Sequence, residues 1–169
     1  MILSGNKLSQ YLKQGKIKIT PFEPKLVGAC SIDFRLGPYF RVFHSHKQRV
    51  TVADKVDYKK YTKEVFAPKG ILVKPGELVL GATIERLALD SRLCGFMQGR
   101  SSMARMGLAV HVSSSLVQPG VDNVQVLEIV NNSPYSLFLA PGLRICQIVF
   151  EETTSPACYS GKFSKQARP

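Results

Sequence analysis

The stretch Gly-Arg-Ser-Ser-Met-Ala-Arg-Met-Gly-Leu, residues 99–108, is the most informative part of the sequence. It predicts a tight turn that leads into a single turn of helix, which runs from Ser101 to about Met106 and ends at Gly107. Ser101 or Ser102 can cap this helix, and backbone N–H groups point out of its start. The segments on either side of it are almost all β-like in pattern.

Arg100 and the two serines make the start of this helix a candidate anion site. A helix N-terminus favours negative charge, and an arginine with two hydroxyls can donate further hydrogen bonds. Arg105 lies four residues after Ser101, so both side chains can face the same way. The alternative interpretation is a capped surface turn with incidental arginines, and the ten residues alone are compatible with both.

Short apolar or alternating stretches broken by Gly, Pro and Asn predict strands along nearly the whole chain. The expected strands cover residues 31–36, 40–43, 70–73, 78–84, 108–112, 124–130, 136–139 and 145–150. One further helix is expected from about Ser4 to Gly15, where Leu8, Tyr11 and Leu12 recur at helical spacing. Strands at such regular spacing predict an all-β jelly roll or barrel.

The 169 residues, 44% of them hydrophobic, fit a single domain, residues 1–169, in which the polar and basic residues 160–169 are expected to form a mobile tail. No secretory pattern or membrane-length apolar run is present, so a soluble cytoplasmic protein is expected. The net charge of +11 favours a polyanionic partner, either nucleic acid or a small phosphorylated ligand. Many of the basic residues fall between Lys47 and Lys63, which is also compatible with a solvated surface stretch.

The four cysteines, Cys30, Cys94, Cys146 and Cys158, are too far apart in sequence to form a metal-ligand pair. Free thiols in a reducing compartment are the simplest interpretation. A zinc deaminase needs a His-x-Glu and a Pro-Cys-x-x-Cys motif to activate water, and the sequence contains neither. No metal ligands are therefore expected, and no catalytic zinc.

Glu128 is an acidic residue in an otherwise apolar candidate strand. Alternation along a strand puts Val124, Val126, Glu128 and Val130 on one face. A carboxylate among three valines would lose part of its hydration, which suits it to proton transfer. The alternative is that a twist or bulge exposes Glu128 to solvent, or that Arg105 merely pairs with it as a structural ion pair.

Several other segments surround these residues in an order that is typical of one known family. Together with residues 99–108 they are Ser-Ile-Asp-Phe-Arg-Leu-Gly (31–37), Pro-Gly-Glu through Thr-Ile-Glu (75–85), His-Val-Ser-Ser-Ser-Leu-Val-Gln-Pro-Gly (111–120), Val-Leu-Glu-Ile with Asn131 (126–131), Pro-Gly-Leu-Arg-Ile (141–145) and Lys-Phe-Ser-Lys-Gln (162–166). On this collinear pattern, which spans nearly the whole chain, the sequence resembles the dCTP deaminase branch of the dUTPase-like family.

The resemblance implies an all-β, dUTPase-like distorted jelly roll (β-clip), with a short N-terminal helix and one short helix after the Gly-Arg-Ser-Ser turn. It implies a hydrolase of pyrimidine deoxynucleotide metabolism, which deaminates dCTP or a related cytosine nucleotide to the uracil nucleotide and ammonia. The active sites would lie between the subunits of a homotrimer. Mg²⁺ would bind through the nucleotide triphosphate and take no part in the deamination.

The same resemblance assigns roles to individual residues. Glu128 would take a proton from water and pass it on, while Ser101 and Arg105 hold the water and orient Glu128. The remaining residues would bind substrate: Ser113 and Ser114 at the pyrimidine edge, Gln118 at the sugar, and Arg100, Ser102, Lys162 and Gln166 at the phosphates once the tail closes.

The loop before Pro119 departs from the family pattern. Gln118 stands where the family usually has an aspartate that contacts the deoxyribose and, in the diphosphatases, helps to activate water. Since an amide is no base, hydrolysis of the triphosphate is not expected, although the Gln118 amide can still hold the sugar. Leu116 and Val121 replace a frequently basic and a bulky aromatic residue, and Asn123 replaces a usual glycine.

Three functions therefore stay open on sequence grounds. The leading one is a dCTP deaminase. The second is a dUTP or dCTP diphosphatase, with or without a deaminase activity, against which Gln118 counts. The third is a non-catalytic nucleotide-binding relative, which the altered loop favours but which does not explain why Ser101, Arg105 and Glu128 occur together. A nucleic-acid binder is disfavoured because the basic residues are not interleaved with aromatics, and a membrane partner is not expected.

Overall fold

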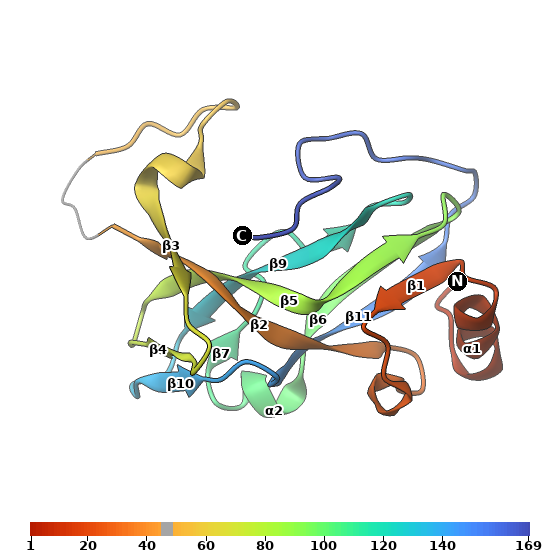
Figure 1. Cartoon of the computed structure of the whole chain (residues 1–169), viewed down its shortest axis with the longest axis horizontal. Coiled ribbons are helices and arrows are strands. Elements are labelled where there is room, and N and C mark those ends of the chain that lie inside the picture. The colour runs from red at the N-terminus through yellow and green to blue at the C-terminus, as the bar shows by residue number, and fades with distance from the viewer. Residues whose placement is uncertain (45–48) are drawn as a thin grey trace.

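The computed structural model of the chain describes residues 1–44 and 49–169 and consists mainly of β-strands (Figure 1). The strands are β1 (Ile17–Thr20), β2 (Ile32–Phe43), β3 (Thr62–Phe66), β4 (Ile71–Val73), β5 (Leu78–Leu89), β6 (Leu93–Gly99), β7 (Leu108–Ala109), β8 (Leu116–Val117), β9 (Asp122–Asn131), β10 (Leu137–Leu139) and β11 (Arg144–Glu152). The helices are α1 (Gly5–Lys13), α2 (Ser101–Ala104) and two 3₁₀ turns, η1 (Pro24–Leu26) and η2 (Tyr58–Tyr61).

A nine-stranded sheet forms the body of the described structure, in the order β7-β9-β5-β2-β11-β6-β8, with β1 added to β5 and β3 added to β2. Strands β4 and β10 pair separately as a small second sheet. The pairing registers shift between Leu36 and Phe40 and between Ala82 and Arg86. Bulges of this kind bend a strand and increase its twist, which is how two twelve-residue strands curl into a jelly-roll-like body. The all-β expectation is confirmed.

Apolar alternation explains where the core lies. Along β9 and β11 every second residue is buried, and Phe34, Phe40 and Phe150 are the largest of the side chains with no exposed surface. Helix α1 adds Leu8 and Tyr11 to this core, and Gly15 follows it with a φ of +69°, a conformation that favours glycine. The helix expected between Ser4 and Gly15 is therefore confirmed.

A buried ion pair ties β2 to β5 inside this sheet. Glu85 is fully buried, and its Oε1 lies 2.6 Å from Nε of Arg35, while its Oε2 accepts the Arg35 backbone N–H at 2.8 Å. Arg35 also pairs with Glu23, just before η1. The hydrogen bonds from Lys25 and from Arg35 hold the pKa of Glu23 below its usual value. Each charged side chain of this cluster, Arg35, Glu85, Glu23 and Lys25, therefore has an oppositely charged partner.

The short helix after the Gly-Arg-Ser-Ser turn forms as expected, with one correction. Its first residue is Ser101, its N-cap is Arg100, and no side chain makes a capping hydrogen bond. The prediction that Ser101 or Ser102 caps it is wrong because both serines already lie within the helical turn. Gly107 follows with a φ of +79°, packed against Ser133.

Among residues 1–44 and 49–169, no helix is both long and apolar enough to span a membrane. Lys47, at the start of the basic stretch, lies outside the described residues. The later part of that stretch forms η2 and the beginning of β3.

Candidate active site

A hollow of about 570 Å³ lies on one side of the sheet, walled by strands β5 and β9, the loop before Pro119, η2 and the tail. Its lining includes Leu78, Leu80, Val126 and Glu128 from the strands, Val112 to Gln118 from the loop, and Phe43 and Tyr58 from the first half of the chain. Tyr159, just before the tail, and Phe163 and Gln166 of the tail complete it. Among the described residues that line it, Glu128 is the sole carboxylate, and there is no lysine or arginine.

Glu128 lies in the middle of β9, directly opposite Leu80 on β5. Its Oε2 accepts hydrogen bonds from the backbone N–H groups of Val112, at 2.7 Å, and Ser113, at 3.0 Å. The side chain is half-buried, on the same face of β9 as three half-buried valines, as the alternation predicts. The two N–H donors compensate for part of the hydration that the apolar neighbours remove, and they fix the direction in which the carboxylate points.

The loop over Glu128 is held by the sheet and by the tail. The Ser115 carbonyl accepts the Met97 N–H at 2.8 Å, and the Pro119 carbonyl accepts the Tyr159 N–H at 2.9 Å. Gly120 has a φ of +71° and lies so close to Cys158 that a Cβ atom there would meet its Sγ at 2.5 Å. The Pro119-Gly120 turn thus allows the segment around Cys158 to pack closely against it. The turn also fixes the position of Gln118 in the hollow.

Residues 160–169 run beside β9 (Figure 1), and Phe163 and Gln166 of this tail line the hollow. Asn123 donates its side-chain amide to the Phe163 carbonyl at 2.8 Å. Gln166 accepts the Val124 N–H through its own carbonyl at 3.2 Å and donates its side-chain amide to the Val124 carbonyl at 3.2 Å. The tail is therefore tied to β9 by one backbone and two side-chain hydrogen bonds, and the Gln166 side chain is engaged with the protein's own backbone.

Three residues, Tyr58, Phe163 and Lys162, bring aromatic and positive groups together beside the hollow. The rings of Tyr58 and Phe163 lie 6.5 Å apart, and the Lys162 ammonium lies 5.9 Å from one ring centre and 5.6 Å from the other. Burial raises the pKa of the Tyr58 hydroxyl, so it remains a neutral phenol at the hollow's edge. Lys162 is exposed and stands over the mouth, outside the lining itself.

The structure brings together only some of the residues expected at the site. Glu128, Ser113, Ser114, Gln118 and Gln166 all line the hollow. Ser101 and Ser102 of α2, and Arg105 directly after it, are exposed on the surface, and in the described part of a single chain they do not line the hollow. Arg100 pairs instead with Asp33 at 3.3 Å and donates to the Arg144 carbonyl at 3.1 Å.

Sequence reasoning missed the aromatic wall of the hollow. Phe43 could have been found, because alternation along β2 puts it on the same face as Tyr39 and Arg41. Tyr58 carries no such signal, since it comes from a 3₁₀ turn after a basic stretch. The described residues contain no group of three or more His, Cys, Asp or Glu side chains placed to hold a metal ion.

The curled all-β sheet and the carboxylate-bearing hollow define the class of protein, the dUTPase-like fold. The crystal structure of the 2′-deoxycytidine 5′-triphosphate deaminase from Agrobacterium tumefaciens is similar, with a TM-score of 0.70 and 21% sequence identity over 90% of this chain. This chain spans about half of the Agrobacterium chain, 48%.

Sequence comparison narrows the class further. The family model described as dCTP deaminase-like matches residues 2–153, and the chain belongs to that family. A dCTP deaminase from Thermomicrobium roseum is 38% identical over 163 residues, which cover 93% of this chain and 82% of that protein. A dUMP-forming dCTP deaminase from Salinispora arenicola is 36% identical over 160 residues, which cover 94% of this chain and 83% of that protein.

Proposed function

We propose that this chain is a dCTP deaminase that hydrolyses the exocyclic C–N bond of cytosine without metal activation of the water. Membership of the dCTP deaminase-like family supports the substrate class. The observation that carries the chemistry is the half-buried carboxylate of Glu128, oriented by two backbone N–H donors inside a hollow large enough for a nucleoside. Cytosine nucleotides belong to the cytoplasmic pool, where we expect the enzyme to work.

The reaction is a hydrolysis in which dCTP and water give dUTP and ammonia. Glu128 takes a proton from water as the oxygen bonds to C4 of the pyrimidine, and it delivers a proton to the ring nitrogen. Glu128 then takes the proton of the new C4 hydroxyl and passes it to the amino group, so that C4 becomes a carbonyl carbon and the amino group leaves as ammonia. A positioned carboxylate of this kind typically contributes a factor of about 10²–10⁴ to the rate. Ser113 and Ser114 border the same space and are placed to read the pyrimidine edge.

Ser101 and Arg105 reach this chemistry from a neighbouring subunit. Both are exposed and lie outside the hollow of their own chain, although they are the residues expected to hold the water and balance charge. A homotrimer in which α2 of one subunit faces the hollow of the next would complete the site and bring Arg100 and Ser102 to the phosphates. Closed symmetric assemblies of identical chains are the common solution for such shared sites.

Magnesium would accompany the triphosphate and stay away from the reacting carbon. Mg²⁺ is usually held by substrate phosphates together with one or two carboxylates. Glu128 is the sole carboxylate among the described residues that line the hollow, so side chains alone would not supply enough ligands for Mg²⁺ there. Phosphate oxygens of the nucleotide would be its ligands. Lys162 and Gln166 would approach the phosphates from the tail, and Gln118 the sugar.

A bifunctional enzyme is the second candidate, because several relatives, including the one from Salinispora arenicola, are named dUMP-forming. Cleaving the phosphoanhydride would require a second group that activates water. The position nearest the sugar side of the loop is Gln118, whose amide cannot accept a proton from water. We therefore expect dUTP, with its triphosphate intact, as the product.

The deciding assay incubates the protein with dCTP, dCMP, CTP or dUTP and Mg²⁺, and follows ammonia, uracil nucleotide and pyrophosphate separately. We expect ammonia from dCTP without pyrophosphate, and a loss of about 10²-fold or more in Glu128→Gln. Glu151→Gln, the same change on β11 outside the hollow, is the matched control. Pyrophosphate would support the bifunctional enzyme. Tight binding without turnover would show a non-catalytic relative.

A further inference from the structure

Arg41 is a buried cation on the same side of the sheet as Glu128. Arg41 pairs directly with Leu80, and Leu80 pairs directly with Glu128, so the three side chains share one face of strands β2, β5 and β9. Two strand spacings separate the Cα atoms of Arg41 and Glu128 by about 10 Å. Arg41 is 7% exposed, far below what is usual for an arginine.

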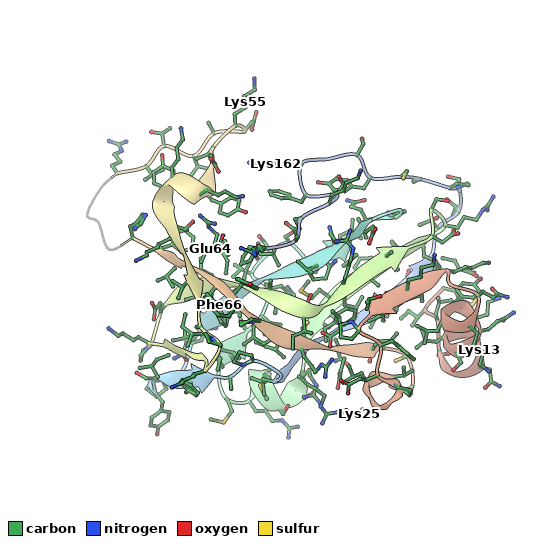
Figure 2. All side chains as sticks on the ribbon, in the orientation of Figure 1. Lys13, Lys25, Lys55, Glu64, Phe66 and Lys162 are labelled. Atoms are coloured by element: carbon green, nitrogen blue, oxygen red, sulfur yellow. The ribbon has the colours of Figure 1, made fainter. Side chains whose placement is uncertain are left out.

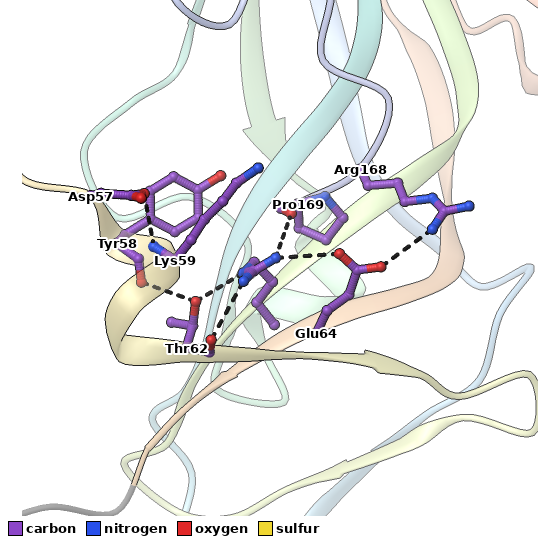
Figure 3. A network of polar contacts seen from close by, with 8 residues as sticks. Asp57, Tyr58, Lys59, Thr62, Glu64, Arg168 and Pro169 are labelled. Carbon is purple, nitrogen blue, oxygen red and sulfur yellow. Dashed lines mark hydrogen bonds and ion pairs between the residues drawn. The ribbon is translucent and has the colours of Figure 1, made fainter.

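Arg41 makes one short hydrogen bond and three longer polar contacts (Figure 3). Its Nε donates to the Thr62 hydroxyl at 2.8 Å, which is a good hydrogen bond. Its two terminal nitrogens make longer contacts, 3.4 Å to the Thr62 carbonyl, 3.3 Å to Glu64 and 3.5 Å to the Pro169 carbonyl. The outer edge of the guanidinium is therefore weakly held, and a better acceptor could replace these oxygens.

Positive charge exceeds negative charge around this edge. Glu64 is shared between Arg41 and Arg168, each at 3.3 Å, and it is 40% exposed. The Tyr58 ring lies between Arg41, 5.8 Å from its centre, and Lys162, 5.9 Å from its centre. Figure 2 shows Lys162 and Glu64 on the side of the molecule that carries the tail, away from Lys13 and Lys25. Three cations, Arg41, Arg168 and Lys162, thus stand against two nearby carboxylates, Glu64 and Asp57, beside a hollow whose described lining has no cation.

We propose that Arg41 is an anion-binding residue of the hollow, which takes the phosphate end of the ligand when the Pro169 carbonyl moves aside. This assignment rests on the proposed function for the identity of the ligand, a pyrimidine nucleoside polyphosphate. A base held at Glu128 would direct its 5′ substituent along the face that carries Arg41, two strands away. The Pro169 carbonyl, 3.5 Å from a terminal nitrogen of Arg41, lies where a phosphate oxygen would bind once the tail moves aside.

Calorimetric titration with inorganic tripolyphosphate tests this site without any turnover. We expect Arg41→Gln to weaken binding of tripolyphosphate by about tenfold, because a charge-assisted hydrogen bond is lost. We expect Glu64→Gln to strengthen it by about threefold, because the acceptor that competes for Arg41 loses its charge. Controls with the same charge changes are Lys59→Gln on η2 and Glu151→Gln on β11. A merely structural arginine would not give opposite effects in the two variants.

Unchanged tripolyphosphate affinity in a folded Arg41→Gln variant would overturn the assignment. If that variant does not fold, the Glu64→Gln variant decides, and failure to tighten binding overturns it equally. Titration with dCTP and with deoxycytidine separates this inference from the proposed function. Arg41→Gln should weaken dCTP and leave deoxycytidine unchanged. If the protein binds tripolyphosphate through Arg41 yet shows no affinity for deoxycytidine, the anion site stands and the substrate assignment falls.

Discussion

At the scale of single residues, two glutamates, Glu85 and Glu128, differ in the groups that bind their carboxylates. Glu85 has no exposed surface and is fixed by two donors from Arg35, whereas Glu128 is half-buried and is fixed by two backbone N–H groups. The first carboxylate is locked into a structural pair, while the second keeps its free oxygen directed into a hollow. This difference in partners separates the structural from the candidate catalytic glutamate.

Breaking the buried pair should destabilise the fold strongly. In Glu85→Gln, Arg35, whose side chain is 16% exposed, keeps its charge without its fully buried main partner, which costs about 3–5 kcal/mol of unfolding free energy. Urea denaturation followed by circular dichroism measures this loss. Glu23→Gln, which removes the more exposed partner of the same arginine, is the matched control and should have a much smaller effect. Equal losses in the two variants would contradict the assignment of Glu85 as the dominant partner.

The thiols should react in an order set by their burial. Cys30 and Cys158 are exposed, while burial raises the pKa of the Cys94 and Cys146 thiols, most of all that of fully buried Cys146. Since the thiolate is the reactive form, Ellman's reagent should label the two exposed thiols rapidly and Cys146 only after unfolding. Rapid labelling of Cys146 in the native protein, mapped by mass spectrometry, would show that β11 is not packed as described.

At the scale of secondary-structure elements, the sequence pattern predicted most of the sheet but not its junctions. Alternation located β9 and β11 to within a few residues, because one face of each is buried. The pattern split β2 in two at Pro38, where a register shift lets one strand continue. It missed β1, β3, β6 and β8, and β8 is only two residues long. The short or edge segments β1, β3 and β8 are defined by their partners, which the local sequence does not encode. The missed β6, in contrast, is a seven-residue strand inside the sheet, between β11 and β8.

The candidate site shows the same division. Glu128 and its loop were predictable because they are close in sequence and follow a strand pattern. The aromatic wall was not, since Tyr58 and Phe163 are brought together by the tail, more than a hundred residues later in the chain. Nor did the sequence show that Ser101 and Arg105 lie outside the hollow of their own chain.

The tail should protect the backbone of β9 from solvent exchange. Its Gln166 carbonyl accepts the Val124 N–H, while the Gln125 N–H is bound internally by the Thr83 hydroxyl. Removal of residues 160–169 should therefore speed hydrogen exchange at Val124 by about tenfold or more and leave Gln125 nearly unchanged. Exchange measured by nuclear magnetic resonance distinguishes the two neighbouring amides. Equal rates at Val124 with and without the tail would mean that the tail does not pair there in solution.

At the scale of the whole molecule, the separation of Glu128 from Ser101 and Arg105 has a direct test. Mixing inactive Glu128→Gln subunits with inactive Arg105→Ala subunits should restore activity, because some interfaces then join two intact halves. Random exchange at equal amounts gives about a quarter of the sites in this state if each site uses two neighbours. Activity is measured as ammonia release after the subunits have been unfolded and refolded together.

The mass of the assembly, from sedimentation or light scattering, accompanies that measurement and should correspond to three chains. A double variant that carries both changes in one subunit, refolded with the unaltered chain, controls for simple dilution. No recovery of activity from a mixed trimer would place the complete site within one chain and contradict the shared arrangement.

The pairing between the tail and β9 also bears on solubility. In the described structure β7 pairs with only the last two residues of β9, so it is the tail that covers this margin of the sheet near Val124. When such a sheet margin is uncovered, its backbone N–H and C=O groups are unpaired and can form hydrogen bonds with extended segments of other molecules. An opening of the tail that admitted a ligand would therefore also expose a sheet margin prone to aggregation, so the same hydrogen bonds that hold the tail also shield the sheet from other molecules.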